Sequence, residues 1–351
     1  MMKAISVFLA VLAVFVFTGL VALAEEAKEP DTSTMFSGNL RLHYNKLYNN
    51  ATEEWNQDSF GLHFFELRAK KQVGAMGVFV NYRLGDGNAN YLYEGWISAK
   101  LPCPMEGGKA GLKIGLVPVP FGIFANGLYY PKGIPYAKNW MWDYDYGVRI
   151  DGTCPLGDAL GLDVAVAYLN NENSAGELSA FAPGDCAPCT GDRNNISARL
   201  GVGLAGDLAI KAGGSVQMGT LMREGAEDDD KLGIAGDISI SPKMLPIPVT
   251  LMGEFINYSL ADADTAKGNI MMGQLDITPI KTSGALNSAT LSLHFGMDTP
   301  TEGASVTNLI AQLKLVMCKQ FIIFAQVYGD KIEDVDDMMN KGLRIWLMYN
   351  F

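Results

Sequence analysis

Apolar and polar residues alternate with a period of two in many separate segments of this chain. Alternation of this kind places successive side chains on opposite faces of a β-strand, whereas an amphipathic helix repeats its apolar residues every three to four positions. The pattern therefore predicts half-buried strands and argues against a helical protein. At the C-terminal end one face would hold Leu343, Ile345, Leu347, Tyr349 and Phe351, and the other would hold Gly342, Arg344, Trp346, Met348 and Asn350.

About sixteen segments of roughly ten residues fit this pattern, and tight turns alternate with longer polar connections between them. Short turns at one rim and long loops at the other are typical of a transmembrane antiparallel β-barrel of the outer membrane. We therefore predict an all-β fold with one barrel, whose strands lie near residues 36–46, 59–70, 76–85, 90–101, 109–118, 144–153, 159–169, 194–204, 207–218, 231–241, 248–258, 268–278, 288–298, 306–317, 320–328 and 341–351.

A soluble β-sandwich also alternates, and it is the main alternative fold. Three features count against it: a sandwich rarely needs sixteen strands, its short and long connections need not alternate, and its outward face is the polar one. The terminal Phe351 favours the barrel, because its alternating, aromatic-ended strand resembles the assembly signal of bacterial outer-membrane proteins.

The first residues read as an export signal. One lysine, Lys3, precedes an apolar run that ends in small residues at Ala24, and Glu25 and Glu26 follow. This order predicts a cleaved signal peptide at 1–24, a short N-terminal segment at 25–35 and the barrel at 36–351. The alternative is a retained membrane anchor, because the apolar run approaches the length that spans a bilayer.

The predicted wall and the predicted loops differ in the sign of their net charge. A formal net charge of -11 and a pI near 4.8 argue against nucleic-acid binding, which needs a basic surface. The side chains predicted to face the lumen nevertheless include twelve bases and eight acids, so the wall would carry about +4. Acidic residues are concentrated in predicted long loops, as at 227–230 and 333–337. These residues could bind divalent cations beside lipopolysaccharide, but solvent-exposed loop tips are the simpler interpretation.

Residues 119–143 form the longest and most aromatic connection. Pro118 and Pro120 end the preceding strand because proline lacks a backbone N–H donor. The segment is too apolar for a free surface loop, so we predict that it folds into the lumen as a constriction loop; a subunit-packing loop or a surface lid is the alternative. Its candidate constriction residues are Phe121, Tyr129, Tyr130, Lys132, Lys138 and Trp140.

Three segments resemble the phosphate-selective porin O and P family: residues 112–122 (LKIGLVPVPFG), 145–152 (DYGVRIDG) and 65–70 (FELRAK). In that family a strand ends in a Pro-Phe-Gly element, a long inward loop follows, and the next strand opens with a Gly-Val-Arg-like stretch. The resemblance implies a sixteen-stranded and trimeric porin. The predicted constriction loop has few arginines, so the family's phosphate specificity is not carried over.

Five cysteines occur in the chain, and an exported protein can oxidise them. Cys186 and Cys189 have redox-motif spacing, but their polar loop favours a structural disulfide over a redox centre. Cys103 and Cys154 fall in successive periplasmic turns roughly 9 to 10 Å apart, so a bridge requires the turns to lean together. Cys318 would remain unpaired.

Catalysis, metal binding and a cofactor are not predicted. His43, His63 and His294 are the obvious general bases, and Ser292 shares a strand face with His294, but chance proximity on a strand is the simpler interpretation. A second cysteine pair for a zinc site is missing near Cys186 and Cys189.

These observations predict a porin of the bacterial outer membrane, a water-filled channel for passive diffusion of small hydrophilic solutes. We expect a modest preference for anions, because a basic wall raises their local concentration. The alternative is a structural or adhesive barrel closed by its inner loop. Expected partners are solutes or anions, membrane lipid and lipopolysaccharide, and two further copies of the chain; the wall charges expected to attract solutes are Arg41, Arg68, Arg83, Lys113, Arg149 and Arg199.

Overall fold

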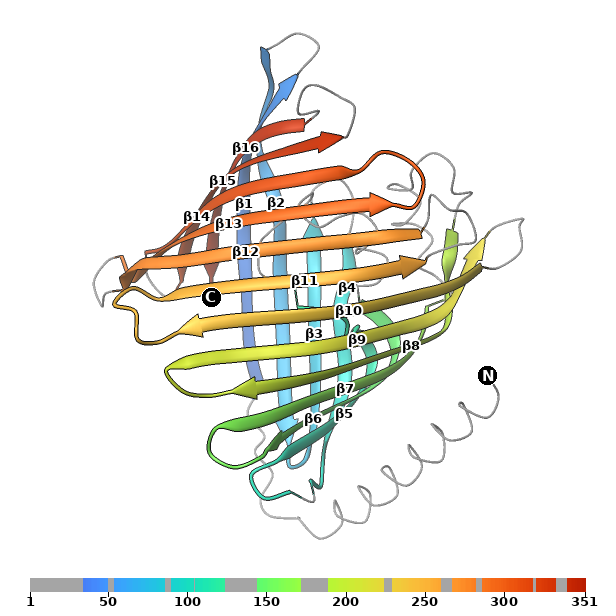
Figure 1. Ribbon diagram of the computed structural model, residues 1–351. Coiled ribbons are helices and arrows are strands. Elements are labelled where there is room, and N and C mark those ends of the chain that lie inside the picture. Colours follow the sequence, from blue (N-terminus) through green and yellow to red (C-terminus); the bar gives the residue numbers. More distant parts are fainter. Residues whose placement is uncertain are drawn as a thin grey trace.

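The computed structural model shows one closed, antiparallel barrel of sixteen strands (Figure 1), in which each strand pairs with its neighbours in the sequence. The structure describes residues 34–49, 54–85, 90–103, 105–123, 144–171, 189–223, 229–259, 267–281, 286–317, 320–332 and 340–351. The predicted all-β barrel and its strand number are thereby confirmed. The predicted signal peptide at 1–24 and most of the segment at 25–35 lie outside the described residues.

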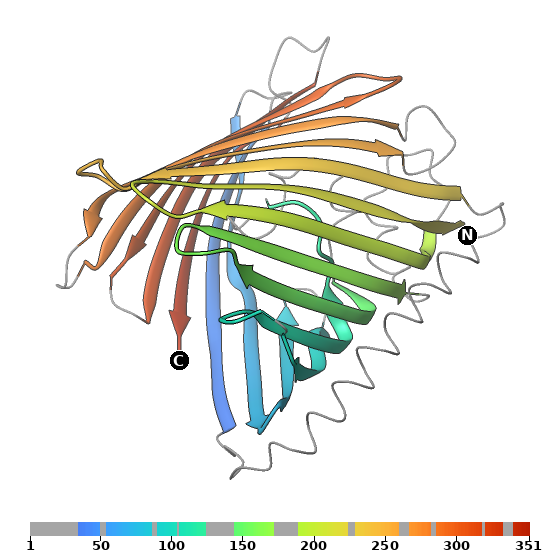
Figure 2. The same cartoon turned by 60° about the horizontal axis from the view of Figure 1, so that its bottom comes forward.

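The strands follow one another around the barrel in chain order, which a second view makes clear (Figure 2). Their bounds are β1 (Thr34–Asn49), β2 (Glu54–Val73), β3 (Met76–Gly85), β4 (Asn90–Leu101), β5 (Lys109–Pro118), β6 (Tyr144–Pro155), β7 (Leu160–Asn171), β8 (Cys189–Leu204), β9 (Leu208–Arg223), β10 (Asp229–Pro242), β11 (Val249–Ser259), β12 (Lys267–Lys281), β13 (Ser288–Pro300), β14 (Val306–Val316), β15 (Phe321–Ile332) and β16 (Asn340–Asn350).

The ring closes where β1 pairs with β16, with Asn39 opposite Asn350 and Asn45 opposite Arg344. Phe351 continues this pairing beyond the last strand, because its backbone N–H donates to the Gly38 carbonyl and its carbonyl accepts from the Gly38 N–H. Closure leaves no free sheet edge, which is the condition for a β-structure in lipid.

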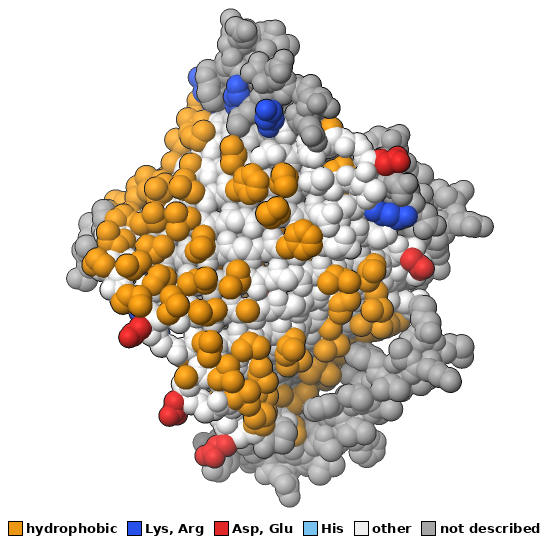
Figure 3. All heavy atoms as spheres, in the orientation of Figure 1, with side chains coloured by type: hydrophobic (Ala, Val, Ile, Leu, Met, Phe, Trp, Pro, Cys, Tyr) orange, Lys and Arg blue, Asp and Glu red, His pale blue; other side chains and the backbone are white. Residues whose placement is uncertain are grey.

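Alternation along the strands separates two faces. On β10 the exposed Ile234 and Ile238 alternate with the buried Ala235 and Asp237, and the same holds on most other strands. Apolar side chains cover much of the outer face seen in Figure 3, while lysine, arginine and carboxylate side chains lie near its margins. An apolar exterior and a polar interior are the arrangement of a membrane barrel rather than of a soluble sandwich.

The connections also differ between the two rims. Turns such as 74–75 and 205–207 are short, and they share a rim with Phe351; connections such as 119–143 and 172–188 join strands at the opposite rim. Several strands extend beyond their predicted bounds toward the long-loop rim, as at β2, β8 and β9. In the described part of the chain, no helix is long and apolar enough to cross a membrane.

Candidate functional site

The start of the predicted constriction loop lies inside the barrel. The chain leaves β5 at Pro118 and runs through residues 119–123 across the inner face of the wall, where Val119, Pro120 and Phe121 are buried. The pairing of β5 with β6 ends at Pro118, opposite Tyr144, and Pro120 has no backbone N–H with which it could be resumed.

Four hydrogen bonds fix residues 118–123, which we call the loop stem, to the wall. Arg149 Nη1 on β6 donates to the Pro118 carbonyl at 2.8 Å, and Ser197 Oγ on β8 donates to the Pro120 carbonyl at 3.1 Å. The Gly122 N–H donates to Ser215 Oγ on β9 at 3.0 Å. The Ile123 N–H donates to Glu254 Oε2 on β11 at 3.4 Å. The stem therefore contacts an arc of the wall from β6 to β11.

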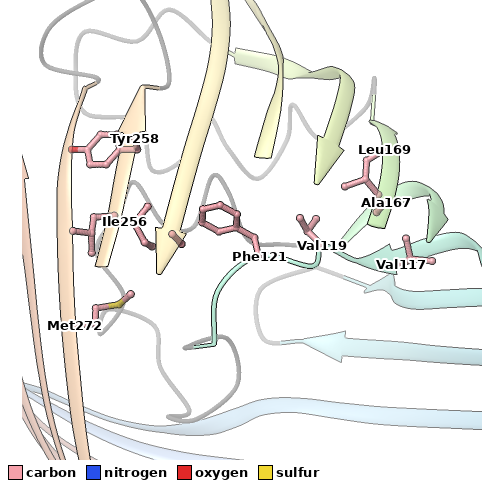
Figure 4. Packing of buried hydrophobic residues seen from close by; sticks show 10 residues of the cluster. Val117, Val119, Phe121, Ala167, Leu169, Ile256, Tyr258 and Met272 are labelled. Carbon is pink, nitrogen blue, oxygen red and sulfur yellow. The ribbon is translucent and has the colours of Figure 1, made fainter. Parts of the chain in front are cut away.

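An apolar cluster surrounds the stem (Figure 4). Phe121 is 1% exposed and points from the stem toward Ile256 on β11, with Tyr258 and Met272 beyond it. Ala167 and Leu169 on β7 complete the cluster on the other side. Burial of an aromatic ring adds a large apolar contribution to the hydrogen bonds that hold the stem.

The remaining predicted constriction residues, Tyr129, Tyr130, Lys132, Lys138 and Trp140, lie outside the described residues. Of the predicted constriction set, the structure describes Phe121 alone. That the whole of 119–143 narrows the pore therefore stays a prediction.

A hydrogen-bonded charge cluster lies on β1 to β3. Glu66 on β2 is 1% exposed and accepts from Arg68 Nη2 at 2.7 Å and from Arg83 Nε at 3.1 Å. Asn39 on β1 and Asn81 on β3 donate to the same carboxylate. The Arg68 side chain keeps 43% of its surface exposed, so one carboxylate is surrounded by two cations of which one reaches the lumen.

A second cluster of like composition lies on β5 and β6. Lys113 and Arg149 are cross-strand partners, and both contact Asp151, at 3.2 Å for Lys113 Nζ and 2.7 Å for Arg149 Nε. Lys113 also lies 5.1 Å from the centre of the Trp96 ring. Arg149 thus joins the charged wall to the loop stem.

On β8 the guanidinium of Arg199 forms a bidentate pair with Asp237 on β10, with 2.8 Å between Nη2 and Oδ1. A bidentate pair fixes both side chains and leaves little net charge for a solute. Arg199 also donates to Ser215 at 3.2 Å, and Ser215 is itself a partner of the loop stem.

Cations cover aromatic and thioether groups on β14 to β16. Arg344 lies 5.5 Å from the Tyr328 ring centre and 5.4 Å from that of Trp346, and Lys314 lies 5.7 Å from the Phe324 ring centre. Arg41 on β1 is buried and donates to the Met348 sulfur at 3.5 Å. These contacts hold positive groups on the inner face of the wall.

Among the side chains that the structure describes, three charged residues join the predicted set of lumen charges. Lys109 and Asp151 face the interior on β5 and β6, and Asp330 does so on β15. Asp330 was missed because the predicted strand ended at residue 328, whereas β15 continues to Ile332. For the described side chains the basic excess is therefore smaller than predicted, since two acids and one base join the set.

Sequence reasoning also missed Ser197 and Ser215 as partners of the loop stem. Both lie on the polar side of an alternating strand, which predicted their face but not their contact. His43 and His294 are interior residues on β1 and β13, where His43 pairs with Trp346 and His294 with Ile310. Within the described ranges, no group of three or more histidine, cysteine or carboxylate side chains could hold a metal ion.

Two of the predicted cysteine positions can be placed with their side chains. Cys103 lies in the turn after β4, and Cys154 is the last residue but one of β6; both are partly buried. Cys189 begins β8, and Cys186 lies outside the described residues, so the predicted bridge between those two stays a prediction.

No protein-family model matches the chain, and neither does any curated protein sequence. Solved structures of similar shape include an anion-selective porin from Comamonas acidovorans, with a TM-score of 0.60, 11% identity and coverage of 92% of this chain and 100% of that one. The trimer form of OmpT, an outer membrane protein of Vibrio cholerae, has a TM-score of 0.59 and 12% sequence identity. The similarity covers 91% of this chain and 99% of that one.

The outer membrane channel DcaP of Acinetobacter baumannii gives a TM-score of 0.57 at 11% identity, over 91% of this chain and 97% of that one. The similarity covers nearly the full length of each structure, although the sequences have diverged widely. The resemblance to the phosphate-selective porin O and P family is supported only as far as the porin fold. The chain has the closed, sixteen-stranded barrel fold of bacterial outer-membrane porins.

Proposed function

We propose that this protein is a porin, a water-filled channel through which small hydrophilic solutes diffuse passively. The observation that carries the proposal is the closed ring of sixteen strands with charged and amide side chains on its inner face and apolar side chains outside. A barrel of this size encloses more space than its own side chains fill. The loop stem crosses the inner face of the wall, and we propose that the segment 119–143 is the constriction of the channel.

A modest anion preference follows from the distribution of charge along the wall. Among the described lumen-facing side chains, bases outnumber acids on the arc from β16 through β1 to β6, whereas acids outnumber bases from β7 to β15. The Glu66 and Asp151 clusters each combine one acid with two bases. The basic arc comprises Arg41, Arg68, Lys70, Arg83, Lys100, Lys109, Lys113, Arg149 and Arg344 against Glu66, Glu94, Asp145 and Asp151.

The barrel belongs in the bacterial outer membrane, where its apolar band meets lipid and its long-loop rim meets lipopolysaccharide. We propose a homotrimer, as the trimer form of the Vibrio cholerae protein suggests. A trimer would cover part of the apolar exterior of each barrel.

Single-channel recording of the refolded protein in a planar bilayer tests this function. A salt gradient across the bilayer gives the reversal potential, and hence the ratio of anion to cation permeability. Steady conductance with an anion-favouring potential is the expected result. A folded barrel without conductance would contradict the porin proposal and favour a structural or adhesive barrel, while cation-favouring conductance would contradict the assigned wall charge alone.

A further inference from the structure

Cys103 and Cys154 lie together at the short-turn rim. They are separated by β5 in the barrel, and two strand spacings would keep them too far apart for a disulfide bond. In the structure the Cys103 sulfur lies beside Gly108, directly before the start of β5. Both are free thiols, and Gly108 precedes Lys109, which pairs with Thr153, the neighbour of Cys154.

Gly108 is what allows this approach. A Cβ added to Gly108 would lie 2.5 Å from Cys103 Sγ and 3.3 Å from the Thr153 carbonyl oxygen. The Cys103 sulfur therefore occupies the space left by the missing side chain and lies beside the end of β6. Gly107, with φ of +72°, and the hydrogen bond of 3.0 Å from the Gly108 N–H to the Met105 carbonyl give the turn this shape.

We propose that Cys103 and Cys154 form a disulfide bond that ties the β4–β5 turn to the end of β6. The oxidant is a disulfide, either that of an exported thiol–disulfide oxidoreductase or oxidised glutathione. The thiolate of one cysteine attacks the oxidant's disulfide, which forms a mixed disulfide and releases one thiolate of the oxidant. The second cysteine thiolate then attacks the protein sulfur of the mixed disulfide and expels the oxidant's other thiolate. One S–S bond forms between Cys103 and Cys154 and one breaks in the oxidant, which leaves as two thiols carrying the two electrons and two protons.

The bond would enclose β5, the whole of 119–143 and β6 in one covalent loop. Both strands that carry the loop stem, with Lys113 and Arg149 on them, would then be fixed to each other at the rim opposite the long loops. A crosslink of this kind restricts the unfolded chain, so the oxidised barrel resists unfolding more than the reduced barrel.

Peptide mapping of the refolded full chain tests the bond. The protein is incubated with oxidised glutathione, its free thiols are blocked with N-ethylmaleimide, and it is cleaved after lysine, arginine and glutamate. These cuts place Cys103 on residues 101–106 and Cys154 on residues 150–172, apart from Cys186 and Cys189. The expected product is the crosslinked pair of these two peptides, together with loss of their alkylated forms.

Single cysteine variants distinguish the proposed bond from disulfides that involve other cysteines. Cys103→Ser and Cys154→Ser should each abolish the crosslinked peptide and the rise in unfolding temperature on oxidation, while Cys318→Ser should keep both. Persistent alkylation of Cys103 and Cys154 after oxidation would overturn the proposal, and so would a crosslink from either residue to a different cysteine. The test is independent of conductance, so a failed porin assay leaves it unaffected.

Discussion

Arg149 donates a hydrogen bond of 2.8 Å to the carbonyl oxygen of Pro118, so a charged wall residue holds the first residue of the loop stem. The same guanidinium contacts Asp151, which fixes its orientation. The side chain that contributes positive charge to the wall thus also positions the backbone of the loop stem on the inner face of the wall.

Replacing Arg149 by methionine should loosen the loop stem. A hydrogen bond from a charged donor contributes about 1.5 to 3 kcal/mol, and its loss leaves the Pro118 carbonyl without this partner. Single-channel recordings of Arg149→Met should show more frequent transitions between conductance levels than those of the parent protein. Lys211→Met removes a lumen-facing base near the short-turn rim and serves as the control; equal noise in both variants would contradict the role of Arg149.

Phe121→Ala should both widen the channel and lower the free energy of unfolding. The ring is almost fully buried in the apolar cluster around the loop stem, and truncating a buried phenylalanine costs about 3 to 5 kcal/mol. Conductance and the urea midpoint in detergent measure the two effects. Phe36→Ala is a matched control, because Phe36 is 78% exposed on the outer face. An unchanged conductance in Phe121→Ala would show that the stem does not restrict the channel.

Arg68→Glu should move the reversal potential toward cation selectivity. The Arg68 side chain is partly exposed to the interior, and reversing its charge places a second carboxylate beside Glu66. Lys71→Glu makes the same charge change on the same strand, but Lys71 lies on the outward face. A shift of equal size in both variants would mean that total charge, rather than wall charge, sets the selectivity.

Gly38→Ala should reduce the yield of closed barrel. A Cβ at Gly38 would lie 2.3 Å from the Glu66 carbonyl oxygen and 2.5 Å from Cζ of Phe351, and the first of these is backbone that cannot rotate away. The folded fraction can be measured as the unheated, fast-migrating band on a gel. Gly161→Ala has no atom within 4 Å of the added Cβ, so it should fold normally; comparable yields for both variants would refute the expectation.

The strands could be predicted from the sequence because each one has a single lipid-facing side, so apolar and polar residues alternate along it with a period of two. The bounds of β3, β4 and β5 were predicted to the residue. Prediction was poorest where strands extend toward the long-loop rim, since both faces are polar there and alternation fades. Asp330 was missed for this reason.

The partners of the loop stem could not have been predicted. The apolar character of 119–143 indicated that it needs shelter, but its contacts with Ser197, Ser215 and Glu254 depend on which strands face β5 after the ring has closed. Such distances are set by barrel geometry rather than by any local pattern. Likewise, the approach of Cys103 to Cys154 depends on the conformation of a turn. The spacing between strands alone does not predict that conformation.

The pairing of β1 with β16 also means that the barrel can close only after the last strand has been synthesised. The ribosome makes β1 first among the sixteen strands and β16 last, so the edge of β1 that pairs with β16 has no partner until all the other strands have been made. During that interval the unpaired edge of β1 is a template for wrong pairing with other chains. Pairing of this edge with another chain therefore competes with closure of the ring until β16 is available.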